Sequence, residues 1–126
     1  MVVALGYGVA GVLFFIAPEL VMTLGIALES PAGQAEVRAM YGGLQIALGL
    51  YLLMGVWRQS WERSALRLAL FSLTGLGLGR TVGLLWADST APVLVGFACL
   101  ELAGASAAWL ALRAIKSEGD ELRSEP

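Results

Sequence analysis

Histidine and cysteine are almost absent from the sequence. None of the 126 residues is histidine, which excludes a Ser-His-Asp triad, a His-ligated haem and the usual zinc sites. Cys99 is the single cysteine, so no intrachain disulfide can form. Carboxylates, methionines and Cys99 form no cluster with metal-ligand spacing. The sequence therefore predicts no metal, no cofactor and no catalytic residue.

Charged residues are also scarce. They make up 14% of the chain and hydrophobic residues 58%, whereas a soluble domain has roughly 25% charged and about 45–50% apolar residues. The mean hydropathy is +0.76. A soluble chain of this composition would expose aggregation-prone apolar patches, which a lipid bilayer covers. The net charge of −2, with 8 scattered Lys and Arg residues, predicts no nucleic-acid partner.

Four apolar stretches separated by polar turns predict an all-α fold, a four-helix transmembrane bundle. A transmembrane helix needs about 20 residues, and each stretch meets this length. We expect a single domain over residues 1–113, followed by a polar tail at 114–126. Turns are predicted at 29–34 and 88–92, and the first helix has a kink or break near Pro18. The expected helices cover about residues 2–28, 36–57, 64–87 and 92–113.

The distribution of basic residues predicts the orientation in the membrane. Four spans place the second loop and the C-terminal end on one side, and most basic residues lie there: Arg58, Arg63, Arg67, Arg113, Lys116 and Arg123. The opposite side offers Arg38 among several acids. The positive-inside rule then predicts an integral plasma (inner) membrane protein with both termini in the cytoplasm.

Glycines inside the expected spans indicate close helix packing. Gly75, Gly79 and Gly83 recur every four residues on the third helix, while Gly42 and Gly49 lie seven apart on the second. Small residues on one face let neighbouring helices approach closely in lipid. We expect these faces to hold the bundle together or, as an alternative, to form an oligomer interface.

Two charged residues lie inside the spans. Arg80 is seven residues before Ala87, roughly 10 Å inside the third span, and Glu101 is nine residues after Pro92, roughly 14 Å inside the fourth. Since these helices meet at the same side, both side chains reach a similar depth. Each would cost about 2.5–3.5 kcal/mol at a span centre, and facing one another they can neutralise and hydrogen-bond. We therefore predict an ion pair.

Polar residues on the second expected helix extend this site. Arg38, Tyr41 and Gln45 follow a 3–4 spacing and share one broad face. We predict a polar pocket open toward the non-cytoplasmic side, with the ion pair at its centre and Glu36 at its rim. The predicted lining is Arg38, Tyr41, Gln45, Arg80 and Glu101.

Each of these assignments has a structural alternative. The ion pair can serve only to fix helix register, although intramembrane charges indicate function by default. Gln45 can be an interhelical hydrogen-bond partner rather than a ligand contact. Glu36 and Arg38 can simply mark the membrane interface.

The second, third and fourth helices carry a pattern that resembles a known family. The segment Glu36-Val37-Arg38-Ala39-Met40-Tyr41-Gly42-Gly43, with Gly79-Arg80, Glu101 and Pro18, resembles an uncharacterised bacterial family of small four-helix membrane proteins, a domain of unknown function. The resemblance covers about Val2 to Arg113. The family is distantly similar to DoxX-like proteins, some of which are small subunits of quinone-linked oxidoreductases, and this similarity implies fold more than function.

Three functions are compatible with the sequence. The first is binding of a lipophilic ligand, such as a lipid or quinone, or service as an accessory subunit to a membrane protein partner. The second is a proton- or anion-coupled transporter or channel, which requires a homo-oligomer because four helices form no evident pore. The third is a membrane enzyme on a lipophilic substrate, although nothing supplies a nucleophile. We expect the first, centred on Arg80 and Glu101.

Overall fold

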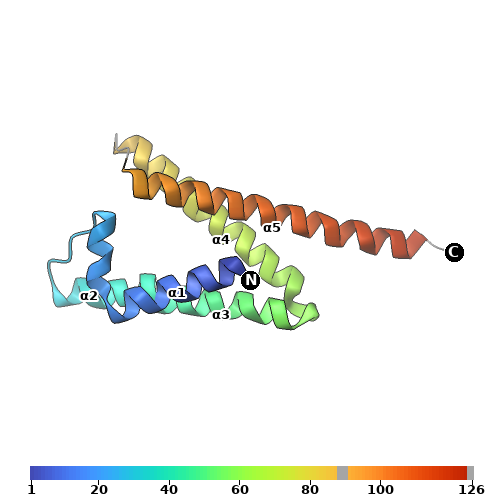
Figure 1. The fold of residues 1–126 in the computed structure, drawn as a ribbon, viewed down its shortest axis with the longest axis horizontal. Coiled ribbons are helices and arrows are strands. Elements are labelled where there is room, and N and C mark those ends of the chain that lie inside the picture. The colour runs from blue at the N-terminus through green and yellow to red at the C-terminus, as the bar shows by residue number, and fades with distance from the viewer. Residues whose placement is uncertain (88–90, 125–126) are drawn as a thin grey trace. The chain divides into compact units, whose positions relative to one another are not determined.

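The structure, a computed structural model, describes residues 1–87 and 91–124, with side chains as far as Ile115. Every regular element among these residues is a helix (Figure 1). Contacts divide the chain into two compact units, Met1–Trp57 and Arg58–Pro126. The predicted all-α class is confirmed, while the four-helix count and the single domain over 1–113 stay predictions.

Three helical segments are long and apolar enough to cross a membrane. They are Pro31–Trp57, Gln59–Trp86 and Pro92–Ile115. A fourth crossing requires the first two helices, Val2–Ile16 and Pro18–Leu24, to count as one span although the chain bends by 112° between them. These lengths and compositions are those of a membrane protein.

The first predicted span is broken. Helix α1 covers Val2–Ile16, and a 3₁₀-helix, η1, covers Pro18–Leu24. Pro18 lacks an N–H and disfavours helical geometry in the preceding residue, and Ala17 accordingly has φ −124° and ψ 74°. At 15 residues α1 is about 22 Å long, short of the roughly 30 Å hydrocarbon core. The expected helix over 2–28 is therefore divided into α1 and η1, residues 25–28 lie outside both, and the break near Pro18 is confirmed.

The second helical segment begins earlier than we expected. Helix α2 covers Pro31–Val37 and begins within the region predicted as a turn. Ser30 caps it, because the Ser30 hydroxyl accepts a hydrogen bond from the Gly33 N–H at 3.1 Å. Pro31 occupies the first turn, where its missing N–H costs nothing.

A π-helical segment, η2, follows at Arg38–Gly43 and leads into α3 at Leu44–Trp57. The Leu44 N–H donates to the carbonyl of Ala39, five residues earlier, as a π-turn requires. Such wide turns occur frequently at functional sites. The π-helical segment η2 includes Arg38–Gly43 of the motif that resembles the family. The periodicity of the sequence did not indicate a π-helix here.

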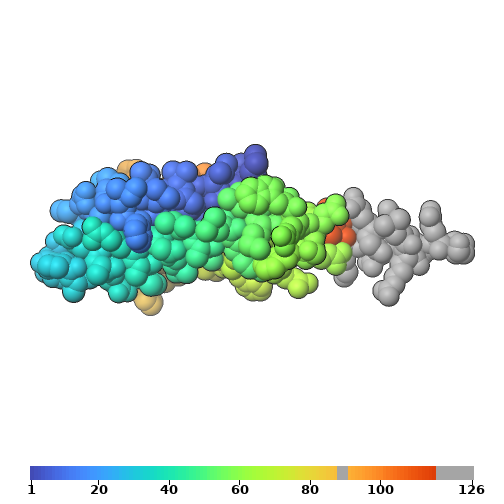
Figure 2. All heavy atoms as spheres, turned by 90° about the horizontal axis from the view of Figure 1, so that it is seen from below, coloured from blue at the N-terminus to red at the C-terminus, as the bar shows by residue number. Residues whose placement is uncertain are grey.

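In the first unit α1 and α3 lie side by side and antiparallel (Figure 1), and their atoms are in direct contact along the seam (Figure 2). Glycine allows this approach. A Cβ on Gly49 would lie 2.8 Å from the Gly8 nitrogen, and one on Gly42 would lie 2.9 Å from the Phe15 Cβ. A Cβ on Gly11 would lie 2.7 Å from the nitrogen of Ile46. The packing role predicted for Gly42 and Gly49 is confirmed.

In the second unit α4, Gln59–Trp86, pairs with α5, Pro92–Ser124, also antiparallel (Figure 1). Both helices extend past the bounds we expected, because α4 includes polar residues of the predicted loop and α5 continues into the predicted tail. Residues 88–90 of the predicted turn lie outside the described residues.

Gly77 packs closely against α5 in the second unit. A Cβ there would lie 2.8 Å from the Leu102 side chain, whereas one on Gly75, Gly79 or Gly83 would meet nothing within 4 Å. The every-fourth-residue stripe therefore makes no close contact with α5, and its predicted role, in the bundle or at an oligomer interface, stays a prediction. Four-residue spacing drifts around a helix of 3.6 residues per turn, and Gly77 lies on the face toward α5.

We expect Gly49→Ala to destabilise the first unit by about 1–3 kcal/mol, because the added methyl group meets backbone atoms that cannot move aside. Gly6→Ala is the matched control, since a Cβ on Gly6 meets nothing within 4 Å. Thermal unfolding in detergent measures both changes. Equal stability of the two variants would contradict the close approach of α1 and α3.

Candidate functional site

Arg80 of α4 and Glu101 of α5 form a bidentate ion pair. The Arg80 Nη2 lies 2.7 Å from the Glu101 Oε1, and the Arg80 Nε donates to Oε2 at 3.1 Å. Two parallel charge-assisted bonds fix both the distance and the relative orientation of the helices. The contact predicted between Arg80 and Glu101 is present.

The surroundings explain how the two side chains meet. Gly77, one turn before Arg80, leaves room for α5, and its missing Cβ would lie 3.4 Å from the Glu101 Cβ. On the other side, the Arg80 guanidinium lies 5.5 Å from the centre of the Phe97 ring, within cation–π range. The Arg80 and Glu101 side chains are 26% and 13% exposed, so the ion pair is mostly buried but is still partly accessible from the surroundings of the protein.

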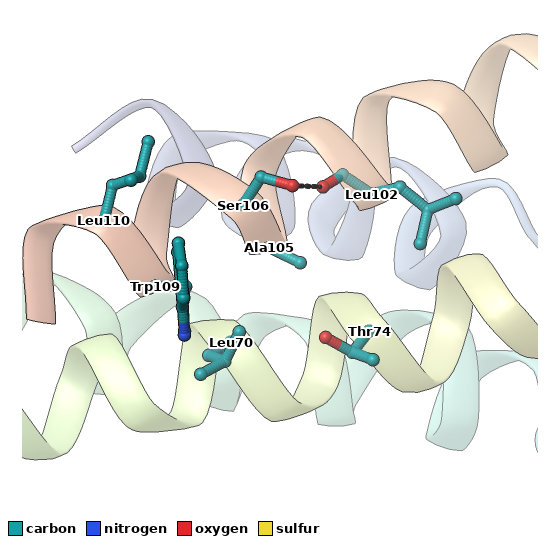
Figure 3. A pocket seen from close by; sticks show the side chains of 7 residues that line it. All are labelled: Leu70, Thr74, Leu102, Ala105, Ser106, Trp109 and Leu110. Carbon is teal, nitrogen blue, oxygen red and sulfur yellow. Dashed lines mark hydrogen bonds between the residues drawn. The ribbon is translucent and has the colours of Figure 1, made fainter. Parts of the chain in front are cut away.

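A groove lies along the seam of α4 and α5, further toward the C-terminus of α5 than the ion pair (Figure 3). Its volume is about 370 Å³, within the range of small-molecule sites. Leucines from both helices and one tryptophan provide most of its surface. The lining residues are Leu70, Thr74, Leu102, Ala105, Ser106, Trp109 and Leu110.

Two hydrogen-bond donors in this groove have no hydrogen-bond partner among the described residues. They are the hydroxyl of Thr74 and the indole N–H of Trp109. Figure 3 shows the Trp109 ring extending from α5 with its nitrogen toward α4, and the Thr74 oxygen pointing along the groove toward Leu70. In contrast, the Ser106 hydroxyl donates to its own helix, to the carbonyl of Leu102 at 2.8 Å.

Other hydroxyls of α4 also bond within the helix. Ser72 donates to the Ala69 carbonyl at 3.3 Å, and Thr81 donates to the Gly77 carbonyl at 2.7 Å. This is the usual way for Ser and Thr to satisfy their donors in an apolar environment. Thr74 departs from it, and its hydroxyl is available to a molecule in the groove.

The other predicted site residues belong to the first unit. The Arg38 Nε donates to the Phe15 carbonyl at 3.2 Å, and this carbonyl lies in the last turn of α1, where no intrahelical partner exists. The positive charge also suits a helix C-terminus. Arg38 therefore caps α1, a role that its sequence position did not indicate.

Tyr41, Gln45 and Glu36 differ in their surroundings. The Tyr41 ring packs edge-on against Phe14, with centroids 5.8 Å apart. Gln45 is half-buried and Glu36 is exposed. The pocket that would join these residues with Arg80 and Glu101 stays a prediction.

Sequence reasoning missed the groove. It gave Thr74, Ser106 and Trp109 no role in ligand binding. Their spacing offered one usable signal, because Leu102, Ser106, Trp109 and Leu110 share one side of a helix at 3–4 spacing. Among the residues that the structure describes, no three Asp, Glu or Cys side chains gather in a way that could hold a metal ion.

We expect Arg80→Gln and Glu101→Gln each to destabilise the second unit, because either leaves one charge unpaired between helices. The double variant should lose less than the sum, with a coupling of about 1–3 kcal/mol in a double-mutant cycle of unfolding in detergent. Arg67→Gln combined with Glu101→Gln is the control and should be additive. Additivity in the Arg80 cycle would contradict the ion pair.

Comparison with known proteins agrees with the family resemblance. A family model described as a domain of unknown function, DUF4345, matches residues 1–112. No curated protein and no solved structure matches the chain. Because the family model covers nearly all of the helical part, both units included, the protein belongs to the DUF4345 family.

Proposed function

We propose that this protein is a non-catalytic, membrane-embedded binding protein for a lipophilic molecule that carries a hydrogen-bond acceptor. The observation that supports the proposal is the groove between α4 and α5. Its walls are mostly apolar, and two of its polar groups, the Thr74 hydroxyl and the Trp109 indole N–H, have no hydrogen-bond partner among the described residues. A carbonyl oxygen of an ester or a quinone accepts hydrogen bonds from such donors.

The cost of unpaired donors explains why a ligand fits here. In a hydrocarbon environment water cannot satisfy them, and an unsatisfied polar group costs several kcal/mol. A bound carbonyl relieves this cost, while its apolar substituents contact Leu70, Leu102 and Leu110. Trp109 is also held in place, because the Arg113 guanidinium stacks 3.7 Å from the centre of its ring.

In this proposal the Arg80–Glu101 pair holds the two walls of the groove in register. The pair forms one fixed cross-link between the helices, so it determines which residues of α5 face Leu70 and Thr74. The larger polar pocket predicted around the pair, with Arg38, Tyr41 and Gln45, stays a prediction from the sequence and carries no part of this proposal.

The charge pattern supports a cellular location and an orientation for the protein. We infer a plasma (inner) membrane location with cytoplasmic termini, supported by the basic residues at one end of the predicted spans. A bacterial source is inferred from the family resemblance alone. The DoxX-like resemblance is compatible with an accessory subunit that presents a lipid or quinone to a partner. Transport or enzyme activity has less support, because the Arg80 and Glu101 side chains are bonded to one another.

We expect gentle extraction from the native membrane to co-purify one lipophilic molecule per chain, detected by native mass spectrometry. Ser106→Phe should abolish this retention, because the larger side chain fills the groove. Ala107→Phe is the matched control, since Ala107 is the next exposed residue and does not line the groove.

Three results would contradict the proposal. One is retention of the molecule by Ser106→Phe, and another is equal loss in both phenylalanine variants. The third is a stoichiometric protein partner with no small molecule, which would indicate an accessory subunit that binds only protein.

A further inference from the structure

Two arginines lie at one end of the groove, one on each helix. Arg67 precedes Leu70 and Thr74 by three and seven residues, so it shares their face of α4. Arg113 follows Trp109 and Leu110 by four and three residues on α5, and its guanidinium is stacked on the Trp109 ring. Both arginine side chains are exposed.

The register of the helix pair places these arginines at the same level. The Arg63 Nη2 donates to the Ile115 carbonyl at 3.2 Å. Because the helices are antiparallel, moving four residues forward from Arg63 to Arg67 moves four residues back on α5, which puts Arg67 opposite position 111. Counting thirteen residues back from the Arg80–Glu101 pair puts Arg67 opposite position 114. Arg113 falls between these two limits.

Neither arginine forms an ion pair within the described part of the chain, in contrast to Arg80. Arg63, one turn before Arg67, already donates to the α5 backbone. Within the described residues, the end of the groove therefore has two cations from opposite walls that form no ion pair with a carboxylate, next to an apolar channel. Clusters of basic residues between membrane helices bind anionic lipid headgroups.

We propose that the ligand of the groove is an anionic phospholipid, with its phosphate between Arg67 and Arg113 and one acyl chain along Leu70, Leu102 and Leu110. This assignment rests on the proposed lipophile-binding function and specifies its substrate class. Arginine forms strong charge-assisted bonds with phosphate oxygens. An ester carbonyl lies between headgroup and chain in such a lipid, and the Thr74 hydroxyl and Trp109 N–H lie between the arginines and the far end of the groove.

The charge pattern also matches the location of such lipids. The groove end that carries Arg67 and Arg113 is the end near the α4 N-terminus, which the positive-inside rule puts at the cytoplasmic face. Anionic lipids give that face a negative surface potential, which attracts basic residues. A neutral lipid would supply no counter-charge to either guanidinium group.

The test uses the full chain in neutral detergent micelles doped with phosphatidylglycerol or phosphatidylcholine that have the same acyl chains. Native mass spectrometry counts bound lipid at each concentration. We expect one phosphatidylglycerol per chain, bound at least tenfold more tightly than phosphatidylcholine. Arg67→Gln with Arg113→Gln should remove this preference, and Arg67→Gln alone, which breaks no contact within the described residues, should reduce it.

Arg58→Gln is the charge-matched control, because Arg58 is exposed, directly precedes α4 and is not part of the groove. It should keep the preference. Loss of the preference in Arg58→Gln to the same extent would overturn the proposal, since the headgroup would then respond only to total charge.

The outcomes separate this inference from the proposed function. Equal binding of both lipids, lost in Ser106→Phe, would refute the anionic headgroup and keep the lipophile groove. Absence of both lipids, or their full retention in Ser106→Phe, would refute the groove itself.

Discussion

An arginine inside an apolar helix needs an opposite charge nearby, and this requirement shapes the second unit. At a span centre each of Arg80 and Glu101 would cost about 2.5–3.5 kcal/mol to insert. Joined by bonds of 2.7 and 3.1 Å, they neutralise one another and bring α4 and α5 together at one defined level. The Arg63–Ile115 contact gives a register of the two helices that lies within about one helical turn of the register set by this cross-link. The groove and the level of its two arginines depend on that register.

The two units solve the problem of helix packing in lipid in different ways. In the first, glycines on both helices bring backbones into contact, and a Cβ on Gly11 or Gly49 would lie within 3 Å of backbone atoms. In the second, Gly77 provides one close approach, the ion pair provides a polar cross-link, and large side chains elsewhere leave a groove. Between α1 and α3, small residues bring the two helices together and close the seam. Between α4 and α5, the salt bridge fixes the helices at one point, and the larger side chains further along leave room for a ligand.

The sequence predicted those features that depend on composition and on charge. Apolar runs indicated membrane helices, and the equal depth of Arg80 and Glu101 indicated their pairing. Features that depend on local backbone geometry were not predicted: the π-segment at Arg38–Gly43 and the capping of α1 by Arg38. The start of α2 was detectable in principle, because Ser30 and Pro31 form a recognisable N-terminus. The packing role of Gly77 and the groove depend on which side of α4 faces α5, and spacing alone did not determine it.

The most direct test of the account is the distance between the Arg80 guanidinium carbon and the Glu101 carboxyl carbon in lipid bilayers, measured by solid-state NMR on labelled protein. The account predicts a separation of about 4 Å, as a bidentate pair requires, and loss of that signal in Glu101→Gln. A separation beyond about 8 Å would mean that each charge is solvated independently, since an ion pair requires N···O contact within about 4 Å. In that case the register of α4 and α5, and the groove that depends on it, would be wrong.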